Sequence, residues 1–556
     1  MPGIRPLLAA AVLALLFAAD AVADEAQAPN GPPPAGVAGE ATGAEGGAGQ
    51  DVAPPADADP LADADPLAGS VAADELPLTL REALEQALLS DLGLAERRLD
   101  TPIAAQQRLQ AEAGFDRLLT AGVELRRDEE PSTSTFFGSG AIRTTTWSAY
   151  GGVRRRLPTG GEISLLYRAD RIDTTRPLST VDPAWRHGVS VDFRVPLGQG
   201  GGSIARSEIL KAHNGMAAAR AGEDAAVEDL VLAVLRAYWE LAFAQRDMAA
   251  RVASEAVAAE LLDDIQARIQ AEVATPLDAA EARAGLERRR SERLLAERSL
   301  DDASDALLAL VRPFRDATAA PRIVAVDDPD AATLLQAGDQ LPVARAVALA
   351  LGARPELRAL QAELATRGVE VLEARDALRP TVDLVGSAST VGFREGWFDS
   401  VKDAAGGEVL SMGLGLEVSL YVGQRAAKAR FRAAGWSREQ TQLRMRQLEN
   451  QIVQDVRRAH RAMGTASAVR RAAEAEVAAA RESLDGERQR LAESKSTPYR
   501  VLEQEELLTE AQTRLARAQI DTRVAEAELW RAAGSLSERL RLTAPRYARC
   551  TPSSWR

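Results

Sequence analysis

The chain has 556 residues, enough for several domains or one large repeated unit. Its formal charge is −14, but residues 24–75 hold eleven acidic side chains and neither Lys nor Arg. Because residues 1–23 are neutral, residues 76–556 carry only −3. A nearly balanced chain gives no support for a nucleic-acid partner.

The N-terminal segment has the pattern of a signal peptide. Arg5 precedes an apolar run over 7–19, which is too short to span a bilayer, and Ala21-Val22-Ala23 forms a small-residue cleavage site. This order is typical of a secretory signal, so we expect residues 1–23 to be removed on export.

Residues 24–75 are rich in Ala, Gly, Pro and Asp and repeat the motif ADADPL. They contain no aromatic residue and little apolar surface to bury, so we expect a disordered linker. A metal-binding acidic repeat is the alternative, which Pro60 and Pro66 disfavour. The only cysteine is Cys550, which excludes an internal disulfide framework and leaves its own role open.

Two helical segments open with similar sequences, LTLREALEQALLSDL from residue 78 and LPVARAVALALGARPEL from residue 341. Ala83, Ala87, Leu88 and Leu94 align with Ala346, Ala350, Leu351 and Leu357. This similarity predicts an internal two-fold repeat. We expect a first repeat at 76–320, a connector at 321–340, a second repeat at 341–538 and a C-terminal tail at 539–556.

Each repeat continues into strand-like sequence, clearest in VLSMGLGLEVSLYV at 409–422. Apolar residues alternate with small or polar ones, as expected for a lipid-facing barrel strand with a wet inner face. The alternative is a long strand of a soluble sandwich. The same alternation occurs at 119–126 and 189–197, and more weakly at 381–388. We therefore expect strands within 119–197 and 381–422.

The first repeat has two further candidate strands, at about 144–156 and 162–170, joined by the tight turn Pro158-Thr159-Gly160-Gly161. The first repeat then has four strands and the second two. Three consecutive arginines, Arg154, Arg155 and Arg156, place at least one charge on each face of this hairpin.

After each strand block, helical sequence runs for about 70 residues, which corresponds to about 100 Å of helix. Val227, Leu230, Val231, Val234, Tyr238 and Leu241 form a heptad-like seam. Each run is broken by Thr-Pro, at Thr275-Pro276 and at Thr497-Pro498, 222 residues apart. Thr suits an N-cap and Pro the first helical turn, so both sites predict the tip of a helical hairpin, near 272–278 and 494–500.

The sequence contains no catalytic constellation. His187, His213 and His460 lack metal-ligand spacing, and GQGGG at 198–202 lacks the Lys-Ser/Thr of a phosphate loop and is interpreted as a strand-to-helix turn. We expect neither an enzyme nor a bound metal or cofactor.

In their order and spacing, these segments resemble the outer membrane efflux protein family, the TolC-like channels. The resemblance rests on LTLREALEQAL at 78–88, AYWELAFAQ at 237–245 and RIQAEVATPLDAAEA at 268–282, and it extends over nearly all of 76–535. It implies an α+β membrane protein with a two-fold internal repeat, in which three subunits share a long α-helical barrel and a transmembrane β-barrel.

The resemblance also implies partners and site residues. A homotrimer in the outer membrane lipid would join a periplasmic adaptor and an inner-membrane pump or ABC-type exporter. At the hairpin tips the adaptor contacts would be Glu272, Thr275, Pro276, Ser494, Thr497 and Pro498. Glu272 and Ser494 depart from the glycine that the family usually has at these positions.

Closure of the tunnel is implied for residues just past the tips, namely Asp278, Glu281, Arg500 and Glu503. Arg500 departs from the acidic residue usual in the family, which suggests a pair with Asp278 or with a carboxylate of the next subunit. The alternative is a solvated helix face, since exposed ion pairs stabilise a fold only weakly.

Two questions stay open in the sequence. The hairpin at 144–170 either enters the membrane, which gives 18 strands in a trimer, or decorates the rim, which leaves 12. The resemblance implies the exit duct of a tripartite efflux or type I secretion system, whereas the alternative function is that of a non-transport periplasmic coiled-coil protein or adhesin. The transported substrate cannot be named from the sequence.

Overall fold

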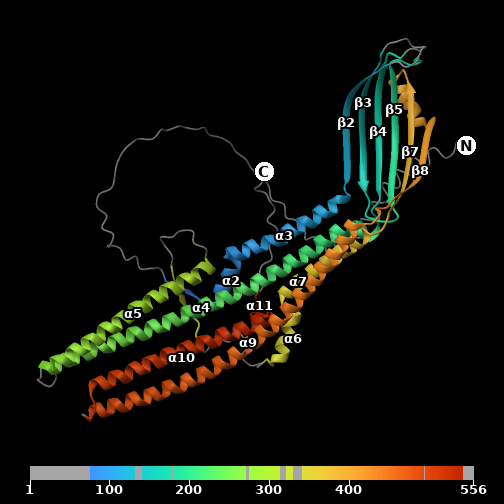
Figure 1. Ribbon diagram of the computed structural model, residues 1–556. Coiled ribbons are helices and arrows are strands. Elements are labelled where there is room, and N and C mark those ends of the chain that lie inside the picture. Colours follow the sequence, from blue (N-terminus) through green and yellow to red (C-terminus); the bar gives the residue numbers. More distant parts are fainter. Residues whose placement is uncertain are drawn as a thin grey trace, which may run out of the picture.

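The computed structural model describes residues 75–131, 141–176, 179–270, 275–312, 321–329, 341–493 and 495–542. The predicted signal peptide, nearly all of the predicted linker, Glu272, Ser494 and Cys550 lie outside the described residues. The described part has two regions, one sheet and a set of long helices that extend away from it (Figure 1).

The described helices include six short ones and four long ones. The short ones are α2 (Leu80–Ser90), α3 (Leu92–Glu112), α6 (Val343–Ala353), α7 (Pro355–Asp376), α8 (Trp397–Gly406) and α11 (Leu536–Arg539). The long ones are α4 (Ser207–Gln270), α5 (Pro276–Val311), α9 (Arg425–Ala492) and α10 (Pro498–Ala533). Two 3-10 turns, Ala113–Phe115 and Gly202–Arg206, connect helices to strands. Helix α8, between two strands, was not predicted from the sequence.

The six long strands form one sheet in the order β2-β3-β4-β5-β7-β8, and every neighbouring pair is antiparallel. The strands are β2 (Arg117–Pro131), β3 (Ala141–Arg156), β4 (Glu162–Thr174), β5 (Ala184–Pro196), β7 (Thr381–Arg394) and β8 (Val409–Ser419). Within the described residues, β2 and β8 are the two edges of this sheet and have no partner beyond them.

Side chains on the two faces of the sheet differ in polarity. Paired residues of neighbouring strands share a face, and side chains alternate along each strand. One face, here called the apolar face, exposes large aliphatic side chains, among them Leu119, Val123, Met412, Leu414 and Leu416. The other, here called the polar face, carries Ser, Thr, Gly and charged residues. The alternation predicted at 409–422 therefore lies on an exposed sheet, and β8 is exposed along its whole length.

The long helices form two antiparallel hairpins, α4 with α5 and α9 with α10 (Figure 1). Helices α4 and α9 have 64 and 68 residues, and α5 and α10 have 36 each. At 1.5 Å per residue, α4 and α9 are each about 100 Å long. Both α5 and α10 begin at the proline of a Thr-Pro pair, so the hairpins turn far from the sheet.

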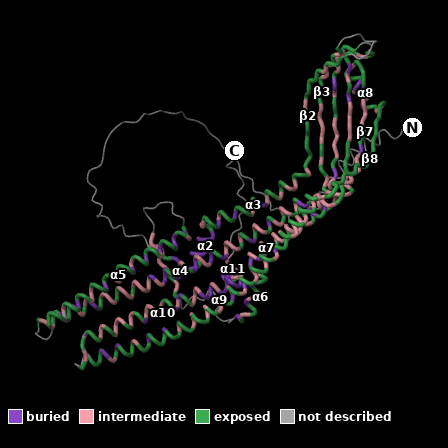
Figure 2. The backbone as a smooth tube through the Cα atoms, viewed as in Figure 1, coloured by how far each residue is buried: buried purple, intermediate pink, exposed green. Residues whose placement is uncertain are grey.

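The main hydrophobic core lies partway along the helices, where α2, α6 and α11 flank the long helices (Figure 2). A two-stranded parallel sheet of β1 (Glu75–Leu78) and β6 (Arg322–Ala325) completes this region. Tyr238, Leu80 and Ile323 are almost fully buried there. The core thus holds the helices together at a position between the sheet and the hairpin tips, two regions that expose most of their surface.

Candidate functional site

The polar face of the sheet carries ion pairs near the end where the strands meet the helices. Arg194 Nη2 lies 2.7 Å from Glu417 Oε2, and Arg194 Nη1 lies 3.3 Å from Asp383 Oδ2. Arg154 lies 3.4 Å from Glu162. Of these residues, Arg194 and Glu162 line an open groove across β4, β5, β7 and β8, together with Ser164 and Ser387. A wall of mixed charge and small polar side chains can stay hydrated without selecting one sign of ion.

The second hairpin tip is organised by a buried carboxylate. Glu487 is only 7% exposed, accepts a hydrogen bond from the Ser496 hydroxyl, and pairs with Arg490 at 2.9 Å. The hydrogen bond from Ser496 lowers the pKa of Glu487, and the charges of Arg490 and Arg500 lower it further. Because Ser496 precedes Thr497, this contact fixes the turn that leads into α10.

The first tip is built differently, from apolar side chains. Leu262, Ile265 and Ala282 form a small cluster between α4 and α5. Ile265 is 222 residues before Glu487, so equivalent positions hold an aliphatic residue in one tip and a carboxylate in the other. Sequence reasoning missed Glu487, and the signal that would have identified it is a Glu at a position where the other hairpin has a core residue.

The residues predicted to contact an adaptor are only partly described. Thr275, Pro276 and Thr497 are exposed. Thr497 occupies the N-cap position of α10, but its side chain makes no capping hydrogen bond, and its carbonyl oxygen instead accepts from the Arg500 N–H at 3.1 Å. Pro498 begins α10, while its side chain, like Glu272 and Ser494, lies outside the described residues.

The predicted gating residues lie in the first two turns of α5 and α10. Arg500, Glu503 and Glu281 are exposed, and the side chain of Asp278 lies outside the described part. Within one chain, Arg500 acts electrostatically on Glu487 of its own hairpin. Between the two hairpins, Arg288 donates to Glu506 at 3.1 Å, a contact that joins α5 to α10 and was not predicted.

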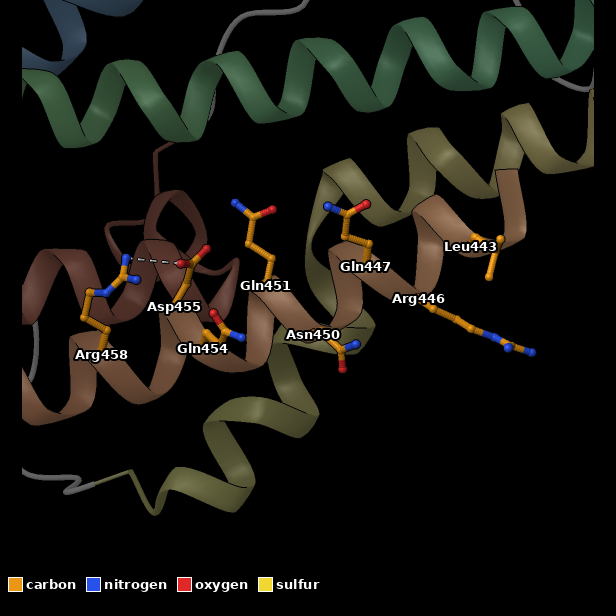
Figure 3. Close-up of a pocket in the computed structure, with 8 residues that line it drawn as sticks. All are labelled: Leu443, Arg446, Gln447, Asn450, Gln451, Gln454, Asp455 and Arg458. Carbon is orange, nitrogen blue, oxygen red and sulfur yellow. Dashed lines mark ion pairs between the residues drawn. The ribbon is translucent and has the colours of Figure 1, made fainter. Parts of the chain in front are cut away.

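One face of α9 is rich in amides. Gln447, Asn450, Gln451 and Gln454 line an open groove together with Asp455 and Arg458, which pair at 3.6 Å (Figure 3). Figure 3 shows the Gln447 and Gln451 side chains projecting to the same side of the helix, while Arg446 points away. Uncharged amides both donate and accept hydrogen bonds, so this stripe suits contact with water or with another polar surface.

A partly buried ion cluster connects four helices beside the core. Arg531 Nη2 of α10 lies 2.7 Å from Glu356 of α7 and 2.6 Å from Asp229 of α4, and Arg354 lies 3.8 Å from Asp455 of α9. Burial raises the pKa of Glu356, but hydrogen bonding and charge from Arg531 outweigh it, so the pKa is lowered overall. The cluster therefore holds Glu356 in its charged form.

Glu526, one turn earlier on α10, behaves in the opposite way. It is 4% exposed, and burial raises its pKa even though Arg523 lies 3.3 Å away. A raised pKa in the folded state stabilises the fold at low pH, and this contribution is lost as the pH rises above the unfolded value of about 4.3.

Replacing Glu526 with Gln is therefore expected to raise the free energy of unfolding at pH 7 by on the order of 1 kcal/mol. Denaturant unfolding of the detergent-solubilised protein, followed by its helical circular dichroism, measures this change. Glu528→Gln is the matched control, because Glu528 pairs with Arg236 and its side chain is 33% exposed, and no gain is expected. A loss of stability in Glu526→Gln at pH 7 would contradict the assignment.

No described helix combines the length and the apolarity needed to cross a bilayer. No group of His, Cys, Asp and Glu side chains in the described ranges has the arrangement of a metal site.

The chain is similar in part of its sequence to outer membrane efflux proteins. Residues 346–535 match the family model described as outer membrane efflux protein. The outer membrane efflux protein BepC of Brucella suis biovar 1 (strain 1330) is 30% identical over 251 residues, which are 44% of this chain and 52% of BepC. The match thus spans about half the length of this curated relative.

Solved structures share the fold over most of the chain. The outer-membrane channel OprN superposes with a TM-score of 0.59 at 16% identity, covering 82% of this chain and 89% of OprN. The outer membrane protein VceC of Vibrio cholerae gives a TM-score of 0.57 at 18% identity, covering 82% of this chain and 96% of VceC. The predicted resemblance is confirmed, as is the predicted combination of long helices with a sheet.

Proposed function

We propose that this chain, which is related to the outer membrane efflux proteins and resides in the outer membrane, is one subunit of a trimeric exit duct. The sheet would form part of a closed transmembrane barrel, and the hairpins would form a tunnel across the periplasm. The observation that carries this proposal is a sheet with an exposed apolar face and a polar face, continuous with helices about 100 Å long.

The unpartnered edges of the subunit support assembly from several copies. Strands β2 and β8 end the sheet, and a membrane sheet must close because unpaired backbone groups are costly in lipid. The helices next to these edges also expose apolar side chains, Leu99, Ile103 and Leu109 on α3 and Trp436 and Leu443 on α9. If β2 of one copy pairs with β8 of the next, α3 of the first copy lies beside α9 of the second, and the apolar side chains of both helices are covered.

The equal lengths of corresponding helices support the two-fold internal repeat. Helices α2 and α6 both have 11 residues, and α5 and α10 both have 36. Two similar hairpins in each of three subunits would enclose a tunnel from all sides. The bounds that we propose for the repeats remain 76–320 and 341–538.

The tunnel and barrel walls suit a passive conduit. The polar face pairs charges of both signs, and the groove that crosses β4, β5, β7 and β8 on the described sheet is open, unlike the enclosed apolar cavities that hold small molecules tightly. Energy for export would come from partners, an inner-membrane pump or ABC-type exporter linked through a periplasmic adaptor. We propose that the adaptor contacts the tips around Thr275 and Thr497.

Three measurements on the purified full-length protein test the duct. We expect heat-modifiable migration in gels, extraction from membranes only by detergent, and ion conductance in planar bilayers. Because the polar face is of mixed charge, the conductance should select weakly between cations and anions. Extraction by salt alone, without conductance, would support a non-transport periplasmic coiled-coil protein or adhesin instead.

The tip residues give a prediction about closure. If Arg500 pairs with Asp278 or with an acid of the next subunit, Arg500→Ala and Asp278→Ala should each raise the fraction of time that single channels spend open. Arg298→Ala is the matched control, since Arg298 pairs with Asp302 on an exposed part of α5 away from the tip, and its removal also deletes one positive charge. If both test variants keep the open fraction and the single-channel conductance of the wild type, these residues form a solvated face and not a gate.

A further inference from the structure

We infer that all six strands of each subunit lie in the membrane, so that a closed barrel of three copies has 18 strands and a lumen wider than that of a 12-stranded barrel. This inference rests on the proposed trimeric channel. It concerns the hairpin of β3 and β4, which the sequence leaves either inside the lipid or on the rim.

The first observation is the position of this hairpin within the sheet. Strand β3 pairs with β2 from Arg117↔Arg155 to Pro131↔Ala141, and β4 pairs with β5 from Glu162↔Arg194 to Ile172↔Ala184. A hairpin outside the membrane would leave β2 to pair directly with β5, and no such pairing occurs in the described sheet. Since β2 reaches the rest of the sheet only through β3 and β4, removing the hairpin from the lipid would remove β2 as well.

The second observation is that neighbouring rows of side chains keep their polarity across all six strands. One row on the apolar face runs through the paired residues Leu119, Val153, Leu165, Val191, Ala388 and Met412. The adjacent row on the polar face runs through Thr120, Gly152, Leu166, Ser190, Ser389 and Ser411. Only Leu166 breaks the polar row. The extra hairpin therefore continues the same two faces as its neighbours.

The third observation is the extent of the uncharged band on β3. Between Trp147 and Arg155, this strand places only Ala149, Gly151 and Val153 on the apolar face. Eight residues of strand span about 27 Å, or about 21 Å along the membrane normal at a tilt near 40°. This is close to the apolar band of about 25 Å found in outer membrane barrels.

The ends of this band have the residues of a membrane boundary. Trp147 is 51% exposed at the outer end, and Trp185 and Trp397 lie at the same end of the sheet, as expected for an aromatic girdle. At the other end Arg155 pairs across the strands with Arg117. The remaining arginines of the run, Arg154 and Arg156, point to the polar face, so no arginine of the three lies within the band.

Helix α8 adds a boundary marker on the same face. A side chain at Gly392 would lie 1.9 Å from the Ser400 carbonyl oxygen, so α8 packs directly against the apolar face of β7. Its Phe398 is 81% exposed. A short amphipathic helix that lies on the apolar face, next to Trp185 and Trp397, fits the interfacial layer of a bilayer.

Six strands are too few for one chain to close alone, because the smallest outer membrane barrels have eight. In an antiparallel sheet of six, the first and last strands run in opposite directions, so β2 of one copy can pair antiparallel with β8 of the next. Three copies then close a ring of 18 strands, a size that leaves an aqueous channel.

Spin-label accessibility in proteoliposomes tests this inference. Single cysteines at Val153, Leu165 and Ser164 are introduced into a full-length Cys550→Ser background, labelled, and exposed to oxygen, which partitions into lipid, or to a nickel chelate, which stays in water. We expect oxygen-to-nickel ratios several-fold higher at Val153 and Leu165 than at Ser164. Leu414 on β8 is the matched control outside the hairpin.

Other labelling results would separate failure of the 18-strand barrel from failure of the proposed channel. Nickel access at both Val153 and Leu165, with oxygen access at Leu414, would place the hairpin outside the lipid and overturn the inference while the channel stands. Nickel access at Leu414 as well would overturn the proposed function itself. Native mass spectrometry of the detergent-solubilised protein is expected to give a trimer, and any other copy number would overturn the count of 18.

Discussion

Replacing Tyr238 with Ala is expected to lower the free energy of unfolding by about 3–5 kcal/mol, the cost of emptying a large buried aromatic site. Tyr238 is fully buried on α4, and its hydroxyl oxygen lies 2.8 Å from Asp327 Oδ2 and accepts from the Val326 and Asp327 N–H groups. Asp327 Oδ2 also accepts from the Leu80 N–H at 2.6 Å. One side chain thus ties α4 to the start of α2 and to the segment after β6.

Tyr238→Phe separates the contribution of the hydroxyl from that of the ring, and Tyr499→Ala serves as a control. Tyr238→Phe keeps the ring but leaves the Val326 and Asp327 N–H groups without the hydroxyl, so we expect a loss of about 1–3 kcal/mol. Tyr499→Ala is the matched surface control, since Tyr499 is 68% exposed, and its effect should stay within about 0.5 kcal/mol. Equal midpoints of denaturation for Tyr238→Ala and Tyr499→Ala would refute the role of Tyr238.

Tyr238 also predicts a pH dependence. Burial raises the pKa of its phenol well above the ordinary value. A raised pKa stabilises the fold fully below the unfolded value of about 10, and this contribution is lost as the pH rises further. The wild-type protein should therefore lose stability above about pH 10 more steeply than Tyr238→Phe, which has no phenol at this site.

Replacing Arg531 with Met is expected to cost about 3 kcal/mol, the lower end of the range for a broken buried ion pair, because Arg531 is buried while the Asp229 side chain is 66% exposed. Arg531 is 9% exposed and bridges Glu356 of α7 and Asp229 of α4. Its loss leaves Glu356 partly buried without its main hydrogen-bond donor. Arg517→Met, on the same helix, is the control, because the Arg517 side chain is 44% exposed and its pairs should contribute less than about 1 kcal/mol.

The penalty in Arg531→Met should shrink in acid. The folded-state pKa of Glu356 is lowered, so its contribution is present above the unfolded pKa of about 4.3 and is lost as the pH falls through the folded value. Unfolding measured at pH 7 and again below pH 4 checks this sign. A penalty that stays constant over this range, or that matches the penalty of Arg517→Met, would contradict the assigned role of the ion pair.

Local sequence patterns were informative wherever the structure depends on near neighbours. The alternation at 409–422 predicted a strand with one apolar face, and the exposed row from Leu410 to Val418 lies on such a face. The two Thr-Pro pairs predicted helix starts, and α5 and α10 begin at Pro276 and Pro498. Periodicity and the fixed backbone angle of proline act within a few residues, so they can be read without the fold.

Other features depend on contacts between distant segments. The burial of Glu487 follows from its place beneath the second tip. Within its own hairpin the sequence resembles an exposed helix face, and only the comparison with Ile265 at the equivalent position marks it as internal. Helix α8 lies between β7 and β8, in a segment for which the sequence analysis predicted no helix, and it packs into space left by Gly392. The cluster at Arg531 joins residues 302 and 175 positions away.

The sequence by itself determined the kinds of element in this protein: alternating strands, and two long helical hairpins whose Thr-Pro tips lie 222 residues apart. Each follows from local periodicity and turn chemistry. Only the tertiary structure decided the order of the strands, and with it the position of β3 and β4 between β2 and β5. The alternation of a strand shows which side chains share a face but not which strand lies beside it. That choice is made by backbone pairing between strands, which depends on how the whole sheet assembles.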